Sequence, residues 1–334
     1  MKPMISAPNS RRRCASKKHV CARRCKSTPF PSGQPGAGTA LQAPWRRAAP
    51  NLENTMRFML LRRSDPAHEA GQPWSAGERA ALAAYTGQMA EAGILRDCQH
   101  FLPSAGGVRL AIADGRATQA AGPFPDSQEL IAGFAVIDVA SRDEALAWAA
   151  RWPAGAAGAA EVEVRLSGCP GGCANVHADS EPDVPGHAVP GQRFAILLRS
   201  SKELENETPV ARARLDALDQ HNAAEARAGV LLGADGLRSS AFGARVRLAS
   251  GKLTVVDGPF TEIKEMIAGY WLIRAPTLQD AIAWATRNPY PVGPPVEVEI
   301  RQLAEIGAAD AVTPAGQRLS AHQSDAGVGA PPPR

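Results

Sequence analysis

Apolar and polar positions along the chain follow two periods, one typical of strands and one typical of helices. Residues 193–199 read Arg-Phe-Ala-Ile-Leu-Leu-Arg, a short and largely apolar run that predicts a buried strand. Residues 296–300 alternate valine and isoleucine with glutamate, which is typical of a half-buried strand. Residues 208–228 predict a helix with Pro209 in its first turn and Gly229 as its stop, because these residue types suit those positions.

Two further strands, a hairpin and a second helix are predicted between these elements. Residues 245–256 predict a hairpin that turns at a Ser-Gly pair, and residues 270–273 predict another buried strand. Thr277 and Asp280 have the spacing of a capping box, so a second helix begins there. The predicted order is strand, helix, strand, inserted hairpin, strand, helix, strand.

The same pattern occurs twice, because residues 57–165 align with residues 193–301 at a constant shift of 136 positions. Of the 109 aligned pairs, 38 are identical, and the alignment needs no gap. In the first copy, Ser75 and Glu78 predict the capping box, and an Asp-Gly pair at 114–115 predicts the hairpin turn. The chain is therefore an internal duplication.

Each copy predicts a βαββαβ, ferredoxin-like unit of the α+β class, with helices on one face of a mainly antiparallel sheet. The other face of each sheet is apolar and must be covered, and two copies can cover each other about a pseudo-twofold axis. Composition adds a basic, disordered extension, a linker rich in proline and glycine, and a disordered tail. The predicted boundaries are 1–55 (extension), 56–166 (first copy), 167–190 (linker), 191–305 (second copy) and 306–334 (tail). Met56 opens the first strand and is an alternative start of translation.

Charge and composition exclude several classes of protein. The net charge of +4 combines eleven Lys/Arg and no acid in residues 1–50 with a net −7 in the remainder. An acidic body with a basic tail is not typical of a nucleic-acid-binding fold, so we expect no direct contact with nucleic acid. No apolar run approaches the roughly 20 residues of a membrane span. Six cysteines in 334 residues are too sparse for a secreted disulfide scaffold, so we expect a reducing, cytoplasmic compartment.

One segment of the second copy resembles a known family. Residues 257–265 read Asp-Gly-Pro-Phe-Thr-Glu-Ile-Lys-Glu, and residues 267–271 read Ile-Ala-Gly-Tyr-Trp. They closely resemble the signature of the YCII-related proteins and, more narrowly, of the branch named for its Asp-Gly-Pro-Phe segment. The resemblance covers about 192–303 strongly and 56–166 more weakly. It implies a bacterial protein with a dimeric α+β barrel, here fused into one chain as an intramolecular pseudo-dimer.

From the resemblance we expect a small molecule, anionic or aromatic, that binds in the cleft between the repeats mainly through the second copy, and two roles stay open. In the first, the chain is a cofactor-independent isomerase- or lyase-like enzyme with Asp257 as general acid or base. In the second, it is a non-catalytic regulatory or interaction module, because genes of this branch often lie beside extracytoplasmic-function sigma factors. The first copy has Ala121 in place of Asp257, and the helix histidine of shorter relatives is replaced by Leu82 and Leu218.

Asp257 is the leading candidate for chemistry. It ends a strand before Gly258-Pro259, which form a rigid exit from the sheet. Its carboxylate either faces the cleft with a raised pKa suited to proton transfer, or stabilises a turn. Because the first copy lacks the carboxylate, the fold tolerates its absence, which favours a functional role.

The other candidates each have a structural alternative. His221 lies one turn after Leu218 and is either a general base or an ordinary surface histidine. Arg245, matched by Arg109, either holds an anionic ligand or forms a cross-strand ion pair. The aromatic residues of the buried strands, Phe134, Tyr270 and Trp271, either line the cleft or fill the core. The remaining predicted ligand-binding residues are Gly258, Pro259, Phe260, Glu262 and Lys264, of which the last two also suit a solvated face.

No cofactor or metal is expected. The chain has no phosphate loop or dinucleotide fingerprint. Cys169 and Cys173, with His177 and His187, have a spacing within the range of zinc ligands, but the segment is a linker with no counterpart in the second copy.

Overall fold

The structure is a computed structural model that describes residues 55–305 except 114–115, 126–128, 156–157, 171, 173–175 and 177–189. Of Lys264 only the backbone is described. All of these residues belong to one compact unit, Arg47–Arg334. The predicted N-terminal extension (apart from Thr55), the C-terminal tail and most of the linker therefore lie outside the described residues.

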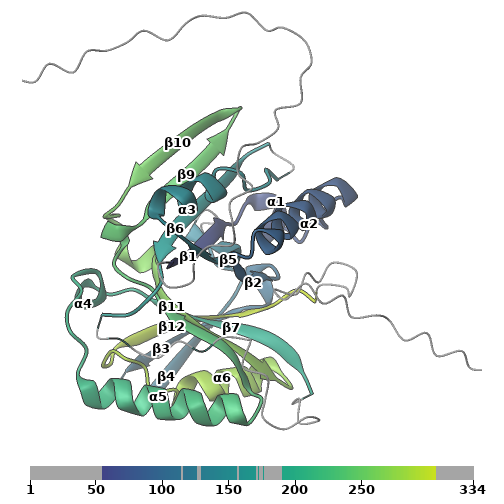
Figure 1. The fold of residues 1–334 in the computed structure, drawn as a ribbon. Coiled ribbons are helices and arrows are strands. Elements are labelled where there is room, and N and C mark those ends of the chain that lie inside the picture. The colour runs from purple at the N-terminus through teal and green to yellow at the C-terminus, as the bar shows by residue number, and fades with distance from the viewer. Residues whose placement is uncertain are drawn as a thin grey trace, which may run out of the picture. The chain divides into compact units, whose positions relative to one another are not determined.

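The two repeats contain the same elements in the same order (Figure 1). The first repeat comprises β1 (Met56–Arg63), α1 (Pro66–Glu69), α2 (Ala76–Glu91), β2 (Leu95–His100), β3 (Val108–Ala113), β4 (Arg116–Ala121), β5 (Ile131–Val139), α3 (Arg142–Ala149) and β6 (Ala160–Leu166). The second comprises β7 (Gln192–Arg199), α4 (Lys202–Glu205), α5 (Arg212–Arg227), β8 (Leu231–Gly236), β9 (Ala244–Ala249), β10 (Lys252–Asp257), β11 (Ile267–Ala275), α6 (Leu278–Arg287) and β12 (Val296–Gln302).

The inserted hairpins are exchanged between the repeats. One six-stranded sheet has the order β10-β9-β6-β1-β5-β2, so the hairpin of the second repeat extends the sheet of the first. The other has the order β4-β3-β12-β7-β11-β8 and receives the hairpin of the first repeat. The pairings that carry the exchange are β6 with β9 and β12 with β3, both antiparallel. Isolated bridges Phe101↔Leu303 and Ser167↔Leu237 join the two sheets.

Three apolar cores follow from the alternation of side chains along the strands. One face of each sheet packs against its own helices, around Trp148 in the first repeat and around Trp284 in the second. The opposite faces share a third core that includes Phe134 and Tyr270, whose ring centroids are 4.9 Å apart. The predicted α+β class, with two ferredoxin-like units face to face, is thus confirmed.

Several local predictions are confirmed. Ser75 caps α2 and Thr277 caps α6, each in a reciprocal capping box. The second hairpin turns at Ser250 and Gly251, which both have positive φ. The matching turn at 114–115 lies outside the described residues.

The predicted start of the helix at residue 208 is wrong. α5 begins at Arg212, and Pro209 precedes it. The short helix α4 comes first and ends at Glu205, so residues 206–211 form the connection between α4 and α5. The long helix therefore begins later than predicted. Neither α4 nor its counterpart α1 was predicted, since four residues carry no measurable periodicity. None of the helices in the described part of the chain is long and apolar enough to cross a membrane.

Candidate functional site

Each repeat has a cavity beneath its first long helix, and the two cavities occupy equivalent positions. In the first repeat the cavity measures about 290 Å³, and its walls include Arg62, Asp65, His68, Trp74, Leu82 and Trp152. In the second repeat it measures about 30 Å³, and its walls include Leu198, Leu204, Val210, Leu218, Asn222 and Trp271. The smaller one has room for little more than a water molecule. Of these two cavities, the first approaches the size of known small-molecule sites and the second does not.

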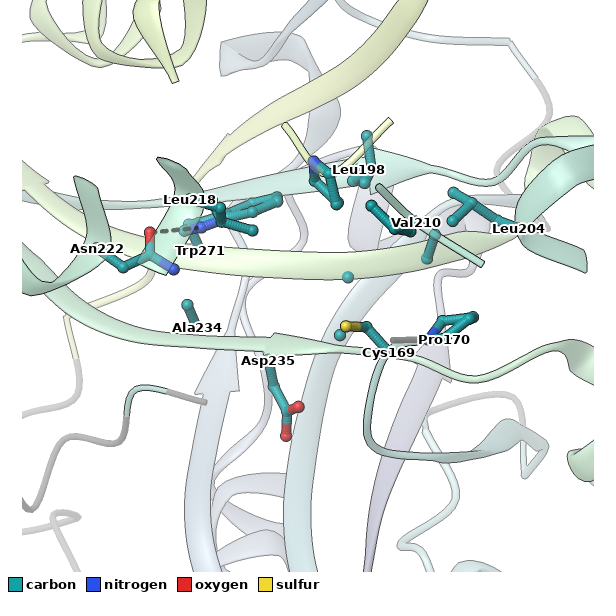
Figure 2. A pocket seen from close by; sticks show the side chains of 14 residues that line it. Cys169, Pro170, Leu198, Leu204, Val210, Leu218, Asn222, Ala234, Asp235 and Trp271 are labelled. Carbon is teal, nitrogen blue, oxygen red and sulfur yellow. Dashed lines mark hydrogen bonds between the residues drawn. The ribbon is translucent and has the colours of Figure 1, made fainter. Parts of the chain in front are cut away.

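Side-chain substitutions between the repeats account for this difference. Leu198 and Leu204 occupy the positions of Arg62 and His68, and Trp271 stands where the first repeat has Ala135. Figure 2 shows these apolar side chains gathered in the second cavity, where the indole Nε1 of Trp271 donates to Asn222 Oδ1 at 3.2 Å. The second repeat therefore fills its cavity with its own side chains.

The first cavity owes its polar wall to the short helix α1. Asp65 caps this helix by accepting the N–H of His68 at 2.9 Å, and Pro66 occupies its first turn. Arg62, near the end of β1, donates from Nη2 to Asp65 Oδ2 at 2.8 Å. Arg62 and His68 are 6% and 9% exposed, respectively. Neither Arg62 Nη1 nor His68 Nε2 has a hydrogen-bond partner among the described residues.

Aromatic rings form the rest of the wall. The guanidinium carbon of Arg62 lies 5.9 Å from the centre of the Trp74 ring. The Trp74 ring meets His100 edge-on at 5.2 Å, and His100 Nδ1 is also buried without a described hydrogen-bond partner. Trp152 is buried and packs on Tyr85 at 5.4 Å. The cavity thus combines two indole rings with unpaired polar atoms.

Burial sets the protonation of the two histidines. It lowers the pKa of His68, and the charges of Arg301 and Arg62 lower it further against the opposing effect of Glu69. Burial also lowers the pKa of His100 to about 4. For Asp65, burial acts to raise the pKa, but the hydrogen bonds from His68 and Arg62 bring it below its ordinary value. At neutral pH both imidazoles are uncharged, and each has one nitrogen that donates and one that accepts.

A second polar feature is a pair of equivalent Arg–Glu clusters. In one, Glu163 of β6 is 1% exposed and lies against Arg63, Arg165 and Arg245, with Arg245 Nε at 3.1 Å. In the other, Glu299 pairs with Arg199, Arg301 and Arg109. Burial opposes ionisation, but the three guanidinium groups lower the pKa of Glu163 to about 2. Because Arg245 and Arg109 come from the exchanged hairpins, each cluster ties the two repeats together.

The family model of the YCII-related domain matches residues 56–166 and 193–304. The chain belongs to the YCII-related family. A solved structure of a protein provisionally described as a chlorite dismutase matches 77% of this chain and 98% of its own, at 8% sequence identity and a TM-score of 0.34. That similarity is too low to carry an argument. No curated protein matches the chain.

In this YCII-related protein, Asp257 lies at the surface. Its side chain is 72% exposed, and Oδ1 accepts from Arg142 Nη2 at the start of α3. The Gly-Pro-Phe residues that follow have a packing role. A Cβ on Gly258 would lie 1.9 Å from the carbonyl oxygen of Ser240, so no larger residue fits. The Phe260 N–H donates to Ser240 Oγ, and its ring lies 4.2 Å from the guanidinium of Arg245.

Arg245 forms a cross-strand ion pair, which is one of the two roles considered for it above. Glu163 on β6 lies directly opposite Arg245 on β9 and is its partner. Tyr270 is 3% exposed in the core between the sheets, whereas its neighbour Trp271 points to the helix side. His221 is half-buried beside Trp284, at 5.5 Å between ring centres, and burial lowers its pKa.

Glu262 is exposed, and the side chain of Lys264 lies outside the described residues. Pro259 is exposed beside Gly258. Near them, burial and a hydrogen bond with Glu129, its counterpart in the first repeat, raise the pKa of Glu265. The structure therefore separates the predicted residues and does not gather them in one cavity.

Cys169 lines the small cavity of the second repeat and is disulfide-bonded, so its sulfur is not a thiolate ligand. Cys173, His177 and His187 lie outside the described residues.

Sequence reasoning missed Arg62, His68, Trp74 and His100. The signal that could have found them is the comparison of the two repeats position by position. Each is polar or aromatic in the first repeat, whereas the second has Leu198, Leu204, Val210 and Gly236. Three of the four, Arg62, His68 and Trp74, line the cavity of the first repeat, and aliphatic residues replace all three in the second repeat.

Proposed function

We propose that this YCII-related protein binds a small molecule, and that its site is the cavity of the first repeat. The observation that carries the proposal is the difference between two equivalent cavities in one chain. The second repeat fills the space with Leu198, Leu204 and Trp271. The first keeps about 290 Å³ open and lines it with Arg62 and His68.

The free-energy cost of burying unpaired polar atoms is an argument that this cavity binds a ligand. A buried donor without a partner costs about 1–3 kcal/mol, and more when it is charged. The first repeat leaves Arg62 Nη1 and His68 Nε2 in this condition, although the second folds with leucines at the same positions. A bound molecule would satisfy both atoms, so the polar wall has a use that packing does not supply.

The chemistry that we infer is proton transfer by a neutral imidazole, since His68 lines the cavity and its Nε2 has no described hydrogen-bond partner. Acid–base catalysis by Asp257 remains a separate prediction. Its exposed carboxylate pairs with Arg142 and lies in neither of the two cavities described above. That position favours a role in holding the hairpin against α3.

Native mass spectrometry of the full chain, purified gently from its own cells, tests the proposal. The double variant R62L/H68L installs the residues of the second repeat, and Asp257→Asn is the matched control. We expect a co-purified small mass in the wild type and in the Asp257→Asn variant, but not in R62L/H68L. A mass lost only from the Asp257→Asn variant would move the site to the hairpin, and no bound mass in any of the three would contradict the proposal.

A second candidate function is a protein-interaction module, which one observation favours. The edge strand β10 exposes Leu253, Val255 and Val256, whereas the equivalent β4 has Ala117, Gln119 and Ala120. An exposed apolar edge is a template for strand addition. If a sigma factor is the partner, Val255→Lys should abolish its co-purification, and unchanged recovery would argue against this edge as the interface.

A further inference from the structure

We propose that the ligand of the first-repeat cavity is a planar, single-ring carboxylate that accepts a hydrogen bond from Arg62 and stacks between Trp74 and Trp152. This inference rests on the proposed function, because it names the class of molecule that the same cavity takes. Three observations support it: the unpaired donor of Arg62, the two indole rings in the cavity wall, and the volume of the cavity.

The unpaired hydrogen-bonding group is a cationic donor, the guanidinium of Arg62. Arg62 Nη2 already donates to Asp65, but Nη1 is buried and has no partner among the described residues. A guanidinium nitrogen donates and never accepts, so the ligand atom that meets it must be an acceptor. Charge-assisted hydrogen bonds to a guanidinium are about twice as strong as neutral ones, which favours a carboxylate oxygen over a carbonyl.

The acidic groups of the wall do not reverse this preference. Asp65 accepts from Arg62 and from the backbone of α1, and Glu78 accepts from the Ser75 N–H at the start of α2. Both carboxylates therefore face hydrogen-bond donors of their own. A cationic ligand would instead be repelled by the charge of Arg62 and would leave Nη1 without an acceptor.

His68 adds a neutral donor to the wall rather than a charge. His68 lines the cavity, its Nε2 is buried without a described hydrogen-bond partner, and burial keeps the ring uncharged near neutral pH. A neutral imidazole with its proton on Nε2 can donate to the second oxygen of the same carboxylate.

The aromatic wall selects a flat molecule. Trp74 and Trp152 line the cavity together with Leu82, and Trp152 is held by Tyr85. Rings that are fixed in this way favour stacked or edge-on contacts with another ring. A volume of about 290 Å³ lies at the lower end of small-molecule sites, which suits one ring with a short substituent.

The test uses three probes of nearly equal shape: benzoate, its neutral isostere benzamide, and the cation benzylamine. Binding to the full chain is measured by titration calorimetry. The indole N–H signals of Trp74 and Trp152, assigned with phenylalanine variants, report where the probe binds. We expect benzoate to shift both signals and to bind at least about tenfold more tightly than benzamide, the difference that one charge-assisted hydrogen bond makes.

Variants then assign the preference to Arg62. Arg62→Gln should remove the advantage of benzoate and leave benzamide unchanged, whereas Arg62→Lys keeps the charge and should restore part of it. Arg142→Gln removes a partly exposed arginine that does not line the cavity, and it should change neither affinity. The urea midpoint of each variant confirms that it is folded.

Two failures are distinguishable. If benzamide or benzylamine shifts the indole signals as strongly as benzoate does, the cavity binds ligands but the inferred class is wrong. If no probe shifts either signal while the Arg62 variants remain folded, the inference fails together with the proposed site.

Discussion

At the scale of single residues, the free energy of this protein depends on a few buried charges. Asp235 on β8 is buried, and desolvation raises the pKa of its carboxyl from 3.8 to about 6, although Ser167 and Arg57 lower it in part. Its side chain points away from Trp271 and Asn222, toward the space between the sheets (Figure 2). The equivalent residue of the first repeat is Gln99, which is neutral and accepts from Arg193 at 3.1 Å.

Replacing Asp235 with asparagine should therefore stabilise the protein at neutral pH. The folded state binds the proton more tightly than the unfolded state, so the free energy of unfolding is highest below pH 3.8 and falls as the pH rises to about 6. A raised pKa of this size corresponds to up to about 3 kcal/mol above pH 6. In urea unfolding at pH 4 and pH 7.5, Asp235→Asn should gain stability only at the higher pH.

The exposed Asp216, which pairs with Arg212 on α5, is the matched control. Asp216→Asn should change the free energy of unfolding little, and equally, at both pH values. The other carboxyls also titrate in this range, so the comparison is the difference between variant and wild type. An equal gain for Asp235→Asn at pH 4 and pH 7.5 would show that desolvation of the charge is not the cause.

The sequence indicated some of these residues and not others, for a physical reason. Gly258 and Pro259 were predicted to form a rigid exit from the sheet because their backbone preferences are local. The burial of Asp235 and the opening around Arg62 depend on which side chains other elements bring near. No local pattern contains that information, although the comparison of repeats contains part of it.

At the scale of elements, the junction after each exchanged hairpin is fixed by a close approach of two main chains. Gly258 follows β10 and lies against the 3-10 turn Ser240–Phe242, and Gly122 meets the equivalent turn at Ser104. The periodicity of the strands predicted the hairpin but not its partner, because the turn lies about 20 residues earlier in the chain.

Gly258→Ala should lower the free energy of unfolding by roughly 2–3 kcal/mol, since its Cβ would overlap a main-chain oxygen. Gly87→Ala is the matched control, and we expect it to change the free energy of unfolding in the opposite direction. Gly87 lies within α2, and a methyl group added there would meet no atom within 4 Å, so alanine should stabilise the helix by up to about 1 kcal/mol. Urea unfolding measures the free energy of unfolding of both variants. Equal effects would mean that the hairpin junction relaxes around the added methyl group.

At the scale of the whole molecule, the exchange of hairpins makes each repeat incomplete without the other. β6 pairs with β9, and β12 pairs with β3, so each sheet takes two of its six strands from the other repeat. The Arg–Glu clusters and the core between the sheets also draw on both repeats. The sequence predicted the duplication and the facing sheets. It did not predict the exchange, because a hairpin has the same pattern whichever sheet it joins.

This architecture predicts that the halves of the chain stay associated after the connection between them is cut. A protease site placed within residues 177–189 should yield two fragments that elute together in size-exclusion chromatography and unfold in one transition with urea. Separating them would expose the strand edges of β6 and β12 and the apolar face between the sheets, so either half produced alone should aggregate or pair with a second copy of itself. Two fragments that elute separately as folded monomers would show that the exchanged hairpins do not hold the repeats together.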